Sequence, residues 1–169
     1  IGKLHFHRKQ VDQAISAYRQ SLSLEKNWKV SQVLTELLIN QNLPQAIKQA
    51  QATQEMADSH FEKKRSLVLL AEAFCANAKQ RPASKFYSEA FHLDPKDFRP
   101  LKLMAACDLR LGYQDAAIRS YEVILKQRPN DAKLWMEYGR LLWQTKRPQQ
   151  AIAALRKSLN LNDTAEVHR

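Results

Sequence analysis

The sequence predicts an all-α fold, an α-solenoid built from short antiparallel helix pairs. Two observations support this prediction: a repeated alanine and a composition rich in helix-forming residues. The alanine returns every 32 to 37 residues, and a tyrosine or large apolar residue follows it four positions later in most repeats. A period near 34 residues is typical of stacked helical arrays. The repeated alanines are Ala14, Ala46, Ala83, Ala117 and Ala151.

The composition excludes several other classes of protein. Apolar residues make up 44% of the chain and charged residues 26%, values that are ordinary for folded soluble domains. Only three glycines occur, and no run of alternating β-branched residues indicates a strand. The longest apolar run, residues 67–71, is far too short to cross a bilayer. The chain is therefore expected to be helical and to lack a membrane span.

Residues 132–163 give the clearest single repeat. Leu134, Tyr138 and Leu142 recur at helical spacing, and the pattern breaks at residues 145–148. A second apolar stripe then begins at Ala151, with Pro148 placed where a first helical turn tolerates a missing N–H. This arrangement predicts two helices joined by a tight turn.

The same pattern divides the whole chain into repeats. We expect one array over residues 1–169, taken from a longer protein, with residues 1–8 forming the back half of a helix. Ser59 and Glu62 have the spacing of a capping box, so the first helix of the third repeat should begin about one turn early. The expected repeats are residues 1–26 (incomplete), 27–58, 59–97, 98–131 and 132–163, with 164–169 opening a further helix.

These residues resemble the tetratricopeptide repeat. Its pattern is Trp-x₂-Leu-Gly-x₂-Tyr, then Ala-x₃-Phe and a later proline. In the last repeat Trp135, Gly139 and Ala151 match it, and in the fourth repeat Ala117 and Tyr121 do so. The resemblance implies a right-handed superhelix whose first helices line a concave groove. It also implies a non-catalytic protein-binding scaffold.

The resemblance also implies which residues line that groove. Most of them are basic, and two are tryptophans, which together with arginines dominate many protein interfaces. An acidic peptide or chain terminus would complement this lining; alternatively, the same side chains form an ordinary solvated surface. The expected groove residues are Trp28, Arg65, Glu72, Arg99, Lys102, Arg110, Lys133, Arg140 and Trp143.

Net charge leaves other partners open. The formal charge of +10 favours an acidic partner, which could be a protein, a nucleic acid or a membrane surface. Binding of RNA or phosphate through the basic surface is one alternative to protein binding. Docking onto an enzymatic or membrane domain of the same parent chain is another, and self-association through exposed array ends is a third.

No set of residues in the sequence indicates catalysis, a metal or a cofactor. The histidines are scattered, and no glycine-rich phosphate loop or nucleophile motif occurs. His5 and His7 lie two apart, so on a helix they point in different directions and would not share a metal. Cys75 and Cys107 are 32 residues apart, a spacing that favours buried free thiols over a metal site or a disulfide framework.

The repeated alanine generates a test of the repeat assignment. Alanine is expected where two helices cross closely, because a larger side chain would force the backbones apart. Ala117→Leu should therefore lower the free energy of unfolding by about 1–3 kcal/mol through overpacking. Chemical denaturation measures this change, and an unchanged stability would refute the assignment of Ala117 to a crossing.

Overall fold

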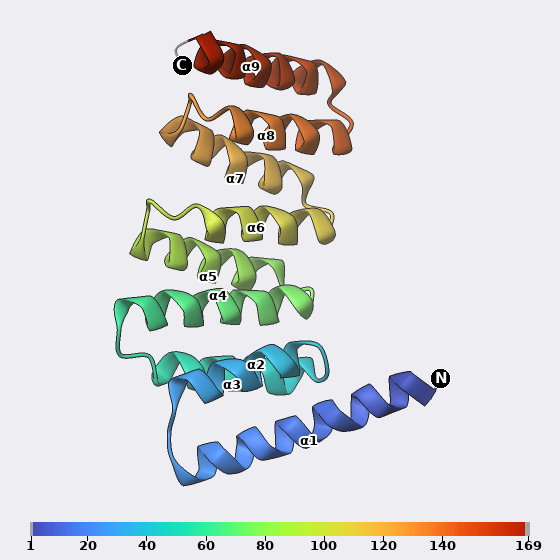
Figure 1. Cartoon of the computed structure of the whole chain (residues 1–169), viewed down its shortest axis with the longest axis vertical. Helices are drawn as coiled ribbons and strands as arrows, with labels where there is room; N and C mark the ends of the chain where they lie inside the picture. The colour runs from blue at the N-terminus through green and yellow to red at the C-terminus, as the bar shows by residue number, and fades with distance from the viewer. Residues whose placement is uncertain (1, 168–169) are drawn as a thin grey trace. The chain divides into compact units, whose positions relative to one another are not determined.

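The computed structural model describes the backbone of residues 2–167 and the side chains of residues 10–162. Nine α-helices and no strand occur in that part of the chain, which confirms the predicted all-α class (Figure 1). The chain forms two compact units, residues 1–100 and 101–169, and each is described separately. Unit 1 contains α1 (Gly2–Leu24), α2 (Trp28–Ile39), α3 (Leu43–Glu55), α4 (His60–Ala76) and α5 (Gln80–Leu93). Unit 2 contains most of α6 (Arg99–Arg110), then α7 (Gln114–Gln127), α8 (Ala132–Gln144) and α9 (Pro148–Val167).

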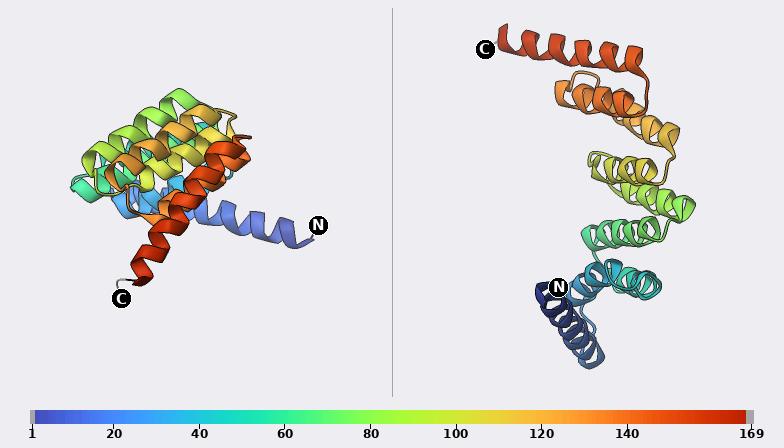
Figure 2. Two further views of the ribbon diagram at one scale, coloured as in Figure 1. Left: turned by 90° about the horizontal axis from the view of Figure 1, so that it is seen from above. Right: turned by 90° about the vertical axis from the view of Figure 1, so that its right-hand side faces the viewer.

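The helices of each unit form the expected pairs. In unit 1, α2 and α3 lie within residues 27–58, and α4 and α5 lie within residues 59–97. In unit 2, α7 completes the repeat that α6 begins, and α8 is followed by α9. The right-hand view of Figure 2 shows these helix–turn–helix pairs. The boundary between the units falls in the first turn of α6, and the prediction of one continuous array stays a prediction.

Side-chain caps fix the start of several helices. Asn27, Asn42 and Asp131 each accept a hydrogen bond from a backbone N–H in the first turn of the helix that follows. The predicted capping box is present: the Glu62 N–H donates to Ser59 Oγ at 3.1 Å, and the Ser59 N–H donates to Glu62 at 3.2 Å. Helix α4 is accordingly long, with 17 residues against 12 in α2.

The turns between paired helices use the left-handed region of backbone space. Gly112, between α6 and α7, has φ +85°, as its position after a helix predicts. Ala78 and Lys146 take the corresponding places in the α4–α5 and α8–α9 turns, with φ of 54° and 59°. One turn geometry therefore recurs, although glycine, which adopts it at least cost, is present in only one of the three turns.

Four of the five repeated alanines are fully buried. Ala46, Ala83, Ala117 and Ala151 all have zero exposed surface. In unit 2, Ala117 and Ala151 share a core with Ile118, Leu141 and Leu142. Ala14 differs from the other four because it is only partly buried.

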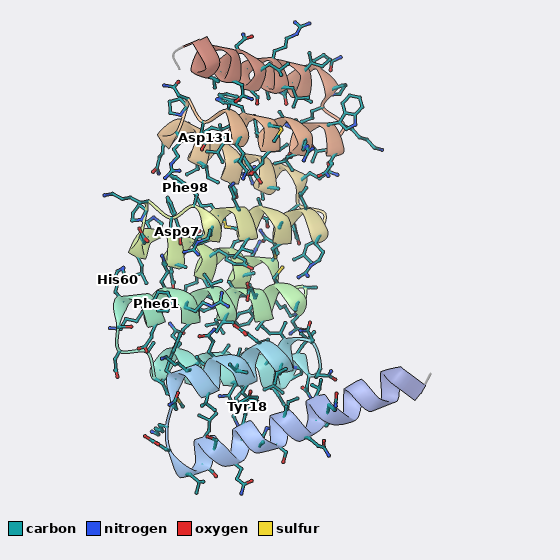
Figure 3. All side chains as sticks on the ribbon, in the orientation of Figure 1. Tyr18, His60, Phe61, Asp97, Phe98 and Asp131 are labelled. Atoms are coloured by element: carbon teal, nitrogen blue, oxygen red, sulfur yellow. The ribbon has the colours of Figure 1, made fainter. Side chains whose placement is uncertain are left out.

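The N-terminal region departs from the prediction. Residues 1–8 were expected to end one helix and Ala14 to belong to the next, but α1 is a single helix of 23 residues. No glycine or proline stands between Gly2 and Leu24 to end it. Tyr18 lies on the side of α1 that packs with Ile15 against α2 (Figure 3).

The C-terminal region departs as well. Helix α9 continues through Asp163 to Val167, so no new helix begins at residue 164. Residues 168–169, which were assigned to that new helix, lie outside the described residues, as does residue 1. The side chains of His5, His7 and His168 are also outside the described range. The remaining repeat boundaries stay predictions.

A buried hydroxyl network joins α2, α3 and α4 in unit 1. The hydroxyls of Ser31 and Thr53 lie 2.7 Å apart, and those of Thr35 and Thr53 lie 3.0 Å apart. Gln49 Nε2 donates to Ser31 Oγ at 2.7 Å, and Trp28 Nε1 donates to Ser66 Oγ at 2.8 Å. Because every member has a partner, the network fixes the register of these helices without leaving an unsatisfied buried group.

The cysteines differ from expectation in one respect. Cys75 and Cys107 are both buried, as predicted, at 4% and 5% exposure. Neither is a free thiol in the structure, so the expectation of free thiols is wrong. The spacing of two cysteines that match no disulfide framework does not show whether their thiols are free.

Gly139 provides a test of the α8–α9 crossing. A Cβ at this position would lie 2.7 Å from Leu155 Cγ. Gly139→Ala should cost about 1–3 kcal/mol through overpacking, offset by about 1 kcal/mol of helix propensity, and so lower the melting temperature. In a Leu155→Ala background the same change should be neutral or stabilising. Equal effects in both backgrounds, measured by thermal unfolding, would contradict the crossing.

Candidate functional site

Unit 2 carries one outward surface that combines apolar and charged side chains. We define the α6–α8 face as Lys102 and Leu103 of α6 with Lys133, Met136, Glu137, Arg140 and Trp143 of α8. The residues on α8 lie three or four positions apart, which places them on one side of a helix. The two helices are joined on this face by Lys102 Nζ, which donates to Glu137 Oε2 at 2.6 Å.

Apolar exposure is high on this face. Trp143 exposes 65% of its surface, Met136 37% and Leu103 36%. Isolated exposed apolar residues are common on proteins, but aromatic and methionine side chains clustered with cations are typical of binding surfaces. Trp143 is therefore exposed, and its place in a binding groove stays a prediction.

The cations of the α6–α8 face fall into two groups. Lys102 is neutralised by Glu137, which also accepts a long hydrogen bond of 3.5 Å from the Tyr121 hydroxyl. Burial, followed by the charge and the hydrogen bond of Glu137, raises the pKa of Tyr121 to about 12, so the hydroxyl keeps its proton at neutral pH. Lys133 and Arg140 are exposed, and neither has an ion-pair partner within the described part of the chain. These two cations are available to an external anion.

In unit 1 the corresponding face is charge-compensated. Arg65 of α4 pairs with Glu36 of α2 at 2.7 Å, and Gln32 also donates to Glu36, at 3.0 Å. Glu72 lies seven residues after Arg65 on α4. Burial raises the pKa of the Glu72 carboxyl, with Arg65 opposing and Glu36 reinforcing the shift. Two carboxylates therefore accompany one guanidinium, and this face does not have the basic character predicted for the groove.

Trp28 does not serve as an exposed anchor. It is 9% exposed, and its indole N–H is already bonded to Ser66. Its ring meets the edge of Phe61, with centroids 6.3 Å apart, and Phe61 is the exposed partner at 66%. Phe61 lies beside His60 at the start of α4 (Figure 3). Burial thus places Trp28 in the packing of α2 against α4.

The last two predicted residues lie near the ends of α6. Arg99, whose side chain is 79% exposed, pairs with Asp97 at 2.8 Å. Asp97 also accepts from Lys64 at 3.0 Å, and these two cations hold the pKa of its carboxyl far below the usual range. Arg110, at the other end of α6, is exposed and is described with unit 2. Arg99 is therefore committed to a local ion pair.

Three groups that the sequence reading missed shape the surfaces. Glu36 and Glu137 neutralise predicted groove cations, and Met136 adds apolar surface between Lys133 and Arg140. A signal for Glu137 was present, because it lies 35 residues after Lys102, about one repeat period. Residues one period apart occupy equivalent positions on successive first helices, so this pair could have been predicted.

Two kinds of site are absent from the described residues: metal-ligand clusters and membrane-spanning helices. Among those residues, no three histidine, cysteine, aspartate or glutamate side chains are grouped as metal ligands would be. None of the helices there is both long enough and apolar enough to cross a bilayer.

Part of the chain matches a known repeat family, and the fold is similar to that of solved structures. Residues 109–165 match a tetratricopeptide repeat family model. The solved structure of MamA is similar at a TM-score of 0.65 and 18% identity, covering 98% of this chain and 96% of that one. A MamA segment from Desulfovibrio magneticus RS-1 gives 0.65 and 13%, covering 96% and 91%. YrrB, described as a TPR protein with an unusual peptide-binding site, gives 0.59 and 14%, covering 94% and 81%. No curated protein matches the sequence.

The partly buried Glu72 predicts a pH-dependent stability. The pKa of the Glu72 carboxyl is higher in the folded chain than in the unfolded chain, where it lies near 4.3. Above that pH the unfolded chain loses the proton more readily, so ionisation of Glu72 lowers the stability of the folded state. Glu72→Gln should therefore raise the melting temperature at pH 7. The gain should disappear below about pH 4, where both states are protonated. Thermal unfolding at pH 3.5 and 7 tests this, and a gain of equal size at both pH values would contradict the assigned cause.

Proposed function

We propose that this chain, a tetratricopeptide repeat protein, is a non-catalytic scaffold whose α6–α8 face binds an acidic segment of another protein. The similarity to YrrB supports the proposal only through the shared fold. The properties of the face itself carry the argument.

The observation that carries the proposal is the alternation of exposed apolar groups with unpaired cations. Along α8, Lys133, Met136, Arg140 and Trp143 follow one another on one side of the helix. An arginine can hold a carboxylate through two parallel hydrogen bonds, and an exposed indole offers a large rigid contact area. A segment that alternates carboxylates with apolar side chains would match both features.

Preorganisation is the physical advantage of this face. Helices α6 and α8 are held together by the Lys102–Glu137 ion pair, and α8 packs on α9 through buried Leu141, Leu142 and Ala151. The receptor therefore loses little conformational freedom on binding, and the entropic cost falls mainly on the partner segment.

The distribution of charge favours unit 2 over unit 1 as the binding site for an acidic segment. In unit 1, Arg65 is already neutralised by Glu36, and Glu72 adds a further carboxylate. An acidic segment would gain little from a face whose single guanidinium is occupied. Binding should consequently depend on Arg140 and Lys133 much more than on Arg65.

Photo-crosslinking tests the proposal. The photoreactive residue p-benzoylphenylalanine would replace Trp143 or, as a control, Tyr113, which is 51% exposed but lies in the α6–α7 turn. The chain would be irradiated in nuclease-treated lysate and the crosslinked proteins identified. We expect one protein to be crosslinked from position 143 and not from position 113. The crosslinked segment, mapped by mass spectrometry, should be rich in Asp and Glu.

A charge-reversal variant supplies the second arm. Lys133→Glu with Arg140→Glu should reduce crosslinking at least about tenfold, the effect of losing roughly 1.4 kcal/mol of binding energy. Arg156→Glu with Lys157→Glu on α9 makes the same charge change away from the face and should have no effect. Loss of binding in both variants, or crosslinks that depend on nucleic acid, would replace the proposal with nonspecific phosphate binding.

A further inference from the structure

A cleft lies between α7 and α8, on another side of α8 from the α6–α8 face. It has a volume of about 340 Å³ and is lined by Glu122, Leu125, Lys126, Trp135 and Tyr138. Trp135 and Tyr138 point away from Met136 and Arg140, because successive residues of a helix turn by about 100°. The volume is at the low end of the range for ligand pockets, about 300–1,000 Å³, so it suits one large side chain.

The polar ends of both aromatic residues in this cleft are already occupied. Trp135 Nε1 donates to the Pro129 carbonyl at 2.7 Å, and the Tyr138 hydroxyl donates to Glu122 at 3.2 Å. The two rings meet edge to face with centroids 6.1 Å apart. Both rings are therefore fixed in place, and what they offer to a ligand is apolar surface, together with that of Leu125.

The charges at the rim of the cleft distinguish between possible occupants. Glu122 is engaged by the Tyr138 hydroxyl, and that carboxylate is the only acidic group among the lining residues. Lys126 lies one turn further along α7, is exposed, and has no ion-pair partner within the described residues. Arg119 lies two turns before Lys126 on α7. It is also exposed and has no ion-pair partner among the residues that the structure describes. An anion is thus favoured beside the apolar floor.

We propose that the α7–α8 cleft binds a single large apolar side chain of a partner segment, while Lys126 holds a carboxylate next to it. The partner chemistry is an apolar residue followed by Asp or Glu, as in the dipeptide Leu-Asp. This site is separate from the α6–α8 face, and it does not depend on the function proposed for that face. A partner segment could therefore contact α8 from two sides.

Fluorine NMR of the full chain labelled with 5-fluorotryptophan tests the cleft. The three tryptophans give three reporters: Trp135 in the cleft, Trp143 on the α6–α8 face and buried Trp28. The probe is acetyl-Gly-Leu-Asp-Gly-amide. Its controls are acetyl-Gly-Leu-Lys-Gly-amide, which reverses the charge, and acetyl-Gly-Gly-Asp-Gly-amide, which removes the apolar side chain. We expect the Leu-Asp peptide to shift the Trp135 signal saturably, with a Kd on the order of 1 mM.

A charge variant tests the role of Lys126. Lys126→Glu should weaken binding of the Leu-Asp peptide by about two- to fivefold, the size expected for losing an exposed ion pair. Lys157→Glu on α9 is the matched control and should leave binding unchanged. Unchanged Trp28 and Trp143 signals in the free variants would show that both remain folded.

Two results would overturn the proposal. One is a Trp135 signal that does not move at any soluble peptide concentration, and the other is an equal response to all three peptides. A shift of Trp143 alone would assign the peptide to the α6–α8 face, leaving the function proposed there intact while removing the cleft. Conversely, a Trp135 shift without a Trp143 shift would support the cleft independently of that function.

Discussion

The close approach of helices at alanine is the constraint on which the rest of the structure depends. Ala46, Ala83, Ala117 and Ala151 are fully buried, and each lets one helix cross another without a side chain between the backbones. Gly139 serves the same purpose on the opposite helix of the last pair, where Leu155 fills the space that a Cβ would need. Because the crossings are tight, the direction of every outward side chain on the first helices is fixed.

Polar contacts then select the register that those crossings allow. In unit 1, the hydroxyls of Ser31, Thr35 and Thr53 satisfy one another inside the α2–α3–α4 packing. A sliding of one helix along another would leave these groups buried without partners, which is costly. Ion pairs on the first helices are more exposed and contribute less to stability, but they decide which cations remain available at the surface. Arg65 and Lys102 are occupied, whereas Lys133 and Arg140 are not.

Helix α8 is the element that links architecture with the proposed binding roles. One side carries Met136, Arg140 and Trp143, and the other side carries Trp135 and Tyr138, which line the α7–α8 cleft and also pack against the core of Leu141 and Leu142. These two surfaces require that the rotation of α8 about its own axis be fixed, and the packing on α9 provides this. Binding to either side of α8 therefore carries little entropic cost for ordering the receptor.

The sequence alone determined the fold class, the helix pairing, the capping box at Ser59 and the left-handed turn at Gly112, because these features follow from local spacing and backbone preference. Only the tertiary structure decided that Trp28 is buried against Ser66 and that Glu36 neutralises Arg65. Burial and ion pairing depend on which helices become neighbours. A repeat pattern predicts which positions contact a neighbouring helix, but it does not specify which side chains of that helix they contact.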